Sequence, residues 1–108
     1  MKVVQPAEMR AFGDIPQRRP LVETEEMRLL SLCLRAGQAL PPHAAPSDLT
    51  LHCLEGRGTF LAEDQSVELT PGVLVHLPRH VQHSLVALED LVCLQVLTPH
   101  PRRAQNPS

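Results

Sequence analysis

The chain has 108 residues, the length of a single domain built around one hydrophobic core. Hydrophobic residues make up 43% and charged residues 20%, a globular balance that excludes an intrinsically disordered chain. The formal charge is −2 and no segment concentrates basic residues, so we expect no nucleic acid as a partner. The sequence has two Phe, no Trp, no Tyr and 18 Leu, which predicts an aliphatic core.

Membrane and disulfide-rich classes are also disfavoured. No apolar run is long enough to span a membrane, and residues 1–10 lack the apolar stretch of a signal peptide. We therefore expect a cytoplasmic protein without a membrane partner. The three cysteines, Cys33, Cys53 and Cys93, form no C-x-x-C pair, and each lies in an apolar run. This pattern predicts buried thiols rather than disulfides or a thiolate zinc cluster.

Prolines and glycines divide the first third of the chain into short segments. Pro6, Pro16 and Pro20 leave room for one short strand at residues 2–4 and an irregular lead-in. Residues 21–36 suit a strand with alternating apolar positions or a helix capped by Thr24, and the leucine content leans towards the helix. Residues 85–97 show the same ambiguity.

The middle of the chain favours short strands. Pro41-Pro42 and Pro46 bracket a turn. Apolar runs at 49–55, 59–62, 67–70 and 73–77 have strand length and are separated by turn signals. Short runs at this spacing indicate an all-β sandwich or barrel. The residues from Thr98 onward read as a frayed tail.

Two segments resemble the sequence motifs of the small single-domain cupins. The first family motif, G-x5-H-x-H-x3/4-E-x6-G, and the second, G-x5-P-x-G-x2-H, are matched in order at Gly37, His43, Gly56, Gly72, Pro78 and His83. The resemblance implies an all-β, cupin-type double-stranded β-helix, also called a jelly-roll barrel. It therefore implies strands in both ambiguous stretches, which periodicity alone leaves open.

The resemblance also implies an organisation and an assembly. Residues 1–27 would form an N-terminal strand and lead-in, residues 28–98 the cupin domain, and residues 99–108 a flexible tail. Small cupins commonly pair, so a homodimer is expected here.

The departures from the family pattern concern the metal ligands. In the family, two histidines and a glutamate of the first motif and the histidine of the second converge on one metal at the barrel mouth. Here Ala45 replaces the second histidine and Leu49 the glutamate, so only His43 and His83 remain. Two imidazoles form a weak site, since stable transition-metal sites usually have three or more protein ligands. The glycine of the second motif is His80.

A third metal ligand would have to come from His52 or Asp48. On a regular strand, alternation places both on the face opposite to Leu49, and a bulge after Pro46 would reverse that parity. The metal-site hypothesis therefore comprises His43, His83, His52 and Asp48, with divalent Fe, Ni, Mn, Cu or Zn as the ion.

Two classes of function stay open. One is a metal-dependent oxygenase or isomerase that acts on a small-molecule ligand in a barrel-mouth pocket around His43 and His83. The alternative is a metal-free binding or sensing module in which the same histidines orient a ligand by hydrogen bonds. Metal-free acid–base catalysis has less support, because the sequence places no carboxylate beside either histidine.

Overall fold

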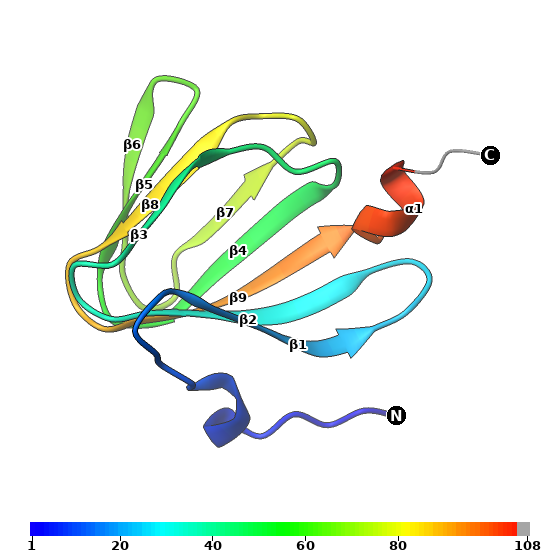
Figure 1. Ribbon diagram of the computed structural model, residues 1–108, viewed down its shortest axis with the longest axis horizontal. Coiled ribbons are helices and arrows are strands. Elements are labelled where there is room, and N and C mark those ends of the chain that lie inside the picture. The colour runs from blue at the N-terminus through cyan, green and yellow to red at the C-terminus, as the bar shows by residue number, and fades with distance from the viewer. Residues whose placement is uncertain (106–108) are drawn as a thin grey trace.

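The protein is built from two antiparallel sheets that face each other (Figure 1). The computed structural model describes residues 1–105. The five-stranded sheet has the order β1-β2-β9-β4-β7 and the four-stranded sheet the order β3-β8-β5-β6. In chain order the strands are β1 (Gln17–Glu23), β2 (Arg28–Leu34), β3 (Ala39–His43), β4 (Asp48–Glu55), β5 (Gly58–Ala62), β6 (Gln65–Leu69), β7 (Leu74–Leu77), β8 (His83–Ala87) and β9 (Leu91–Thr98).

This arrangement confirms the all-β jelly-roll barrel. Both stretches that suited either helix or strand hold strands: residues 21–36 contain the end of β1 and all of β2, and residues 85–97 contain the end of β8 and most of β9. The strands β2 and β9 each supply an alternating apolar face to the space between the sheets. In β2 these inward residues are Leu30, Leu32 and Leu34, all at most 4% exposed. The expected runs at 49–55, 59–62, 67–70 and 73–77 correspond to β4, β5, β6 and β7 with small shifts at their ends.

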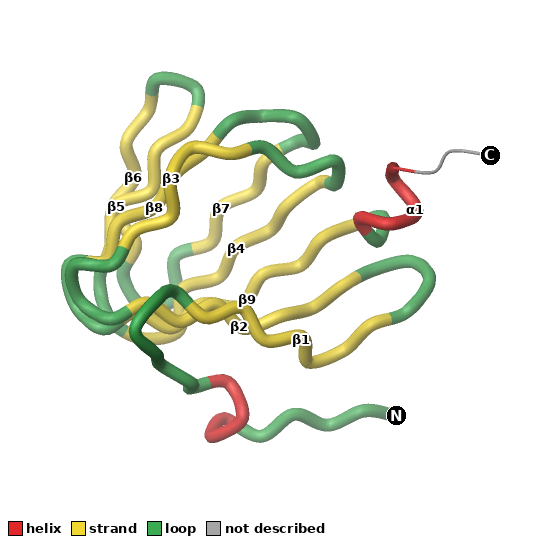
Figure 2. Tube along the Cα trace, in the orientation of Figure 1, coloured by secondary structure: helices red, strands yellow, loops and turns green. Residues whose placement is uncertain are grey.

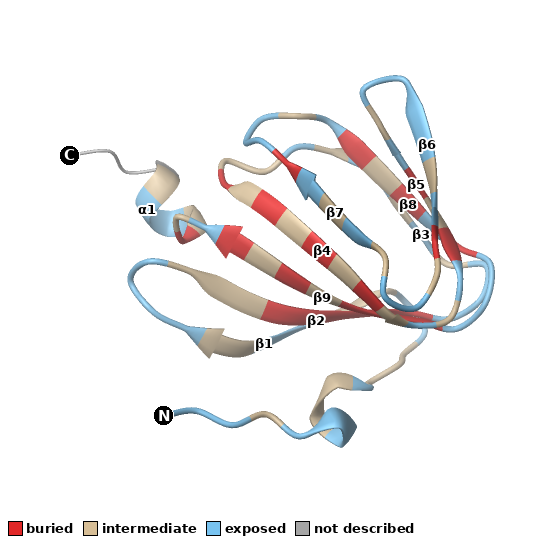
Figure 3. Cartoon of the chain, turned by 180° about the vertical axis from the view of Figure 1, so that it is seen from behind, coloured by how far each residue is buried: buried red, intermediate tan, exposed pale blue. Residues whose placement is uncertain are grey.

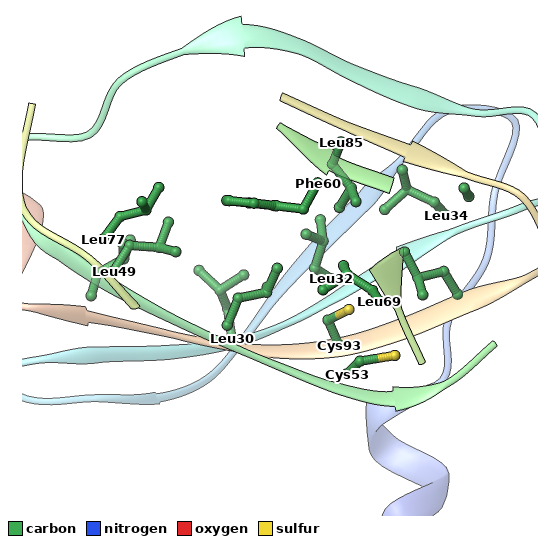
Figure 4. Packing of buried hydrophobic residues seen from close by; sticks show 14 residues of the cluster. Leu30, Leu32, Leu34, Leu49, Cys53, Phe60, Leu69, Leu77, Leu85 and Cys93 are labelled. Atoms are coloured by element: carbon green, nitrogen blue, oxygen red, sulfur yellow. The ribbon is translucent and has the colours of Figure 1, made fainter. Parts of the chain in front are cut away.

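The core is aliphatic, as the composition predicts. Figure 4 shows leucines from both sheets pointing into the space between them, with Phe60 among them. In β4, buried and half-buried residues alternate, so the outer face of this strand is less covered than the inner face (Figure 3). All three cysteines are free and buried. Burial raises the pKa of the Cys53 and Cys93 thiols, which face each other across β4 and β9.

Three expectations about the elements are wrong. Residues 17–20, expected to belong to an irregular lead-in, begin strand β1. Residues 2–4 form no strand, because they have no neighbouring strand to pair with. Pro41 and Pro42 do not bracket a turn but lie inside β3. Proline lacks an N–H donor, and β3 tolerates it because β3 is an edge strand whose register with β8 is irregular between Leu40 and His43.

The short 3-10 helix η1 (Pro6–Met9) lies beside β1 and β2, and helix α1 (Pro101–Gln105) lies beside the β1–β2 loop (Figure 2). At the end of η1, the carbonyl of Met9 accepts a hydrogen bond from the Cys33 thiol. Near the C-terminus, α1 follows His100, which is 6% exposed and donates from Nε2 to Glu23 at 3.1 Å. Within residues 1–105, no helix is long and apolar enough to cross a membrane.

Backbone conformation explains one of the family's glycine positions. His80, which stands where the second motif has glycine, has a φ of 69° in the left-handed region. This region suits glycine and is costly for residues with a Cβ atom. A hydrogen bond of 2.8 Å from the His80 N–H to the carbonyl oxygen of Ala45 holds this backbone conformation at the rim of the barrel. The protein therefore carries a side chain at a turn shaped for glycine.

We expect His80→Gly to stabilise the protein. The substitution removes the strain of the left-handed conformation, but glycine also increases the conformational entropy of the unfolded chain. We expect a net increase of about 0.5–1 kcal/mol in the free energy of unfolding. Urea unfolding of the two proteins measures this difference. The control is Gln82→Gly, at an exposed position without positive φ, which should lower the free energy of unfolding. Equal destabilisation by both substitutions would contradict the explanation.

Candidate functional site

The structure brings His43 and His83 together across two neighbouring strands. His43 ends β3 and His83 begins β8, and the two residues are directly paired in the antiparallel register. Directly opposed residues project to the same face of a sheet. The ring centroids lie 4.3 Å apart, with the ring planes inclined by 58°. We call this end of the barrel, where β3 ends and β8 begins, the mouth.

Backbone carbonyls fix the tautomer of both imidazoles. The Nδ1 of His43 lies 2.9 Å from the carbonyl oxygen of Pro41, and the Nδ1 of His83 lies 2.9 Å from that of Val81. A carbonyl oxygen can only accept, so each Nδ1 carries the proton and donates it. Both Nε2 atoms are therefore hydrogen-bond acceptors in the neutral rings.

A guanidinium group lies beside one of these acceptors, the Nε2 of His43. Arg18, on β1, donates from Nη2 to the Nε2 of His43 over 3.4 Å. Arg18 pairs with Leu32 in the register of β1 and β2, so its side chain leaves β1 on the side of the core. The side chain thus reaches from the five-stranded sheet to a residue of the four-stranded sheet, at the mouth. The sequence reading did not identify Arg18.

His83 is neutral at ordinary pH. It is 6% exposed, and the ring of Phe60 stacks on it at a centroid distance of 5.7 Å. Burial lowers the pKa of His83 and outweighs the hydrogen bond to Val81, which raises it; the nearby His43 and Arg18 lower it further. The Nε2 of His83 is therefore an uncharged acceptor near pH 7.

The space beneath the histidines is small. A cavity of about 10 Å³ lies between the sheets, which is about the room that one water molecule requires. Its lining is mostly leucine, with three polar side chains, and comprises Leu32, Leu40, His43, Leu49, Leu51, Phe60, His83, Leu85 and Gln95. The cavity can hold one functional group of a ligand, and not a whole organic molecule.

Gln95 is a polar member of this lining that the sequence reading missed. It lies on β9, opposite Leu51 of β4 and Leu30 of β2, and is only 8% exposed. The signal was present in the sequence, because Gln95 interrupts the inward series of Leu91, Cys93 and Leu97 at alternate positions. Its amide can both donate and accept a hydrogen bond.

The structure does not bring Asp48 or His52 to the histidine pair. The pairing of β4 is regular from Asp48 to Cys53, so no bulge reverses the alternation. Leu49 and Cys53 are buried on the inner face, while Asp48 and His52 are half-buried on the outer face. Asp48 instead accepts hydrogen bonds from the backbone N–H and the Nε of Arg79, which lower its pKa.

The remaining histidines do not add to the site. His80 is exposed, and His76 is exposed on β7 and hydrogen-bonded to Thr50 at 3.1 Å. His100 contacts Glu23 near the C-terminus, as described above.

The side chains at the mouth do not fit a resident transition metal. Among residues 1–105, no group of three or more His, Cys, Asp and Glu side chains is placed to hold a metal ion. Leu49, in the glutamate position, is 2% exposed and packs in the core. The Nε2 of His43, which a metal would need, accepts a hydrogen bond from the positively charged Arg18. Two imidazoles beside a cation, without a carboxylate, form a poor site for a divalent ion.

Burial of neutral His83 predicts a pH dependence of stability. The pKa of folded His83 lies below the ordinary value of 6.5, so between these two values the unfolded chain binds more protons. The free energy of unfolding therefore falls as the pH drops from 6.5 toward the folded pKa. Urea unfolding at a series of pH values across this window should show a shallower dependence for His83→Gln than for the wild type.

The matched control for this experiment is His76→Gln, at an exposed histidine. This variant should keep the wild-type pH dependence. If His83→Gln and the wild type gave parallel curves, burial would not be shifting the pKa of His83.

Comparisons with known proteins agree with the fold. No protein with a curated description matches the chain. An RmlC-like cupin protein from Desulfovibrio desulfuricans is 27% identical over 93% of this chain and 98% of its own, with a TM-score of 0.84. An RmlC-like cupin family protein from Methanocaldococcus jannaschii is 22% identical, covering 98% and 95% of the two chains with a TM-score of 0.77.

A third structure, KdgF from Halomonas sp., is 23% identical over 83% of this chain and 85% of its own, with a TM-score of 0.76. The family model described as the cupin domain matches residues 30–97, which is more than half of the chain. That match runs from within β2 to within β9 and includes both residues of the histidine pair. The chain therefore belongs to the cupin family.

Proposed function

We propose that this cupin binds a small polar organic molecule directly through the side chains at its mouth, without a resident metal. One observation carries the proposal: the guanidinium of Arg18 hydrogen-bonds to the Nε2 of His43. That nitrogen is the atom through which His43 would ligate a metal, since its Nδ1 is engaged with the carbonyl of Pro41. A ligand at the mouth would therefore contact the cationic guanidinium of Arg18 and the neutral imidazole of His83.

The size of the cavity determines how a ligand would bind. One functional group enters the cavity of about 10 Å³, where His83 and Gln95 meet it. The rest of the molecule stays outside. His83 also contributes to an open groove of about 610 Å³, formed with residues of the β5–β6 hairpin and the segment before β8. This groove offers room for the body of a ligand whose head group reaches His83.

A metal-dependent oxygenase or isomerase is the second candidate function. The tautomers favour it, because histidines that ligate a metal through Nε2 commonly donate Nδ1–H to a backbone carbonyl or carboxylate. Two observations disfavour it: the described residues offer only two metal ligands at the mouth, and the positive charge of Arg18 would repel a metal cation. A metal would require Arg18 to leave His43, and further ligands from water or substrate.

The homodimer stays a prediction. The outer face of the five-stranded sheet offers apolar side chains for an interface, since Leu94 and Val96 are only half-buried there and Leu74 on β7 is 61% exposed. A second copy packed on this face would cover these side chains.

Ligand binding without a metal is tested by a thermal-shift screen of small metabolites on untagged protein, with and without EDTA. We expect the stabilising compounds to keep their effect in EDTA and to lose it in His83→Ala, because the Nε2 acceptor is removed. His76→Ala is the matched control and should respond like the wild type. Stabilisation that disappears in EDTA would contradict the proposal. Near-stoichiometric metal in the untagged protein that is lost in His83→Ala would favour the second candidate.

A further inference from the structure

Arg18 differs from the other arginines of the protein in its partner. Five arginines have a carboxylate oxygen within the 4.0 Å of an ion pair: Arg10, Arg28, Arg57, Arg79 and Arg103. No such carboxylate lies near Arg18 within the described part of the chain. Its recorded partner is the imidazole of His43. Arg18 therefore has no carboxylate partner among residues 1–105, a property it shares with Arg19, Arg35 and Arg102, but it alone of these hydrogen-bonds to the histidine pair.

The neighbouring Arg19 shows that the contact of Arg18 with His43 depends on which face of β1 the side chain leaves. Arg19 also lies on β1, but its Nη1 donates to the carbonyl oxygen of Glu8 at 3.1 Å. Adjacent residues of a strand project to opposite faces, so Arg19 points toward the N-terminal segment and Arg18 toward the mouth. Of these two arginines, only Arg18 places its positive charge beside the histidine pair.

The groups beside Arg18 specify a second feature of the ligand. The Nε2 of buried His83 is a neutral acceptor, so it favours a group that donates a hydrogen bond, such as a hydroxyl. The imidazole that Arg18 contacts lies only 4.3 Å from the ring of His83. The guanidinium and the Nε2 of His83 thus flank the same imidazole pair, an arrangement that suits an anion and a hydroxyl carried on neighbouring carbon atoms of one small molecule.

We propose that the mouth recognises 2-hydroxycarboxylates, with the carboxylate paired to the guanidinium of Arg18 and the hydroxyl donating to the Nε2 of His83. A guanidinium presents paired N–H donors that match the two oxygens of a carboxylate. The hydroxyl is the single group that enters the cavity, where the amide of Gln95 is its other neighbour. This proposal rests on the proposed function, to which it adds the class of ligand.

The test uses glycolate as the probe and glycolamide as its uncharged counterpart. Chemical-shift changes of the backbone amides of Arg18, His43 and His83, followed by NMR in EDTA, give the dissociation constant of each probe. We expect glycolate to bind more tightly than glycolamide by about tenfold or more, as for a hydrogen bond to a charged group. In Arg18→Gln this preference should disappear, and in Arg18→Lys it should be reduced but present.

The matched control is Arg19→Gln, which removes a charge from the adjacent residue of β1 and should keep the preference for glycolate. Retention of the preference in Arg18→Gln would overturn the proposal, as would the absence of shifts at the mouth with glycolate. Equal binding of both probes by the wild type would overturn the carboxylate class and leave metal-free binding standing. Binding of glycolate only after a divalent metal is added would overturn the proposed function as well.

Discussion

The filling of the space between the two sheets by leucine side chains is the constraint on which the rest of the structure depends. Inward residues of β2, β4, β8 and β9 meet there, and the opening that remains is about 10 Å³. Leu49 contributes to this filling at the position where the family pattern has a glutamate. The same packing that stabilises the barrel therefore removes a metal ligand and leaves room for one small group.

The polar chemistry is consequently confined to the mouth. The leucines and Phe60 desolvate His83, which keeps its imidazole neutral. Backbone carbonyls hold both Nδ1 protons, and this orients the rings without any carboxylate. Arg18 supplies the positive charge that a metal would otherwise bring. In the proposed function, this cation and the neutral acceptor beside it would recognise an organic ligand through hydrogen bonds.

Much of the fold could be predicted from the sequence, and less of the site. The apolar runs locate β4, β5 and β7, because alternation and turn residues are local signals. That His43 and His83 come together is implied only by the resemblance to the cupin motifs. Strand β3 could not be predicted, because Pro41-Pro42 is compatible with a strand only at a sheet edge. Arg18 lies outside both motifs. It reaches the mouth only because of the register in which β1 pairs with β2, which local sequence signals do not reveal.

The most direct test of this account is a long-range proton–nitrogen NMR spectrum of the histidine rings, recorded near pH 7 in EDTA. The account predicts that His83 is neutral and that the neutral rings of both His43 and His83 carry their proton on Nδ1. It also predicts that Arg18→Gln shifts the Nε2 resonance of His43 more than that of His83. A proton on Nε2 of either residue, or a charged His83 ring, would contradict the arrangement of donors and acceptors from which the ligand class follows.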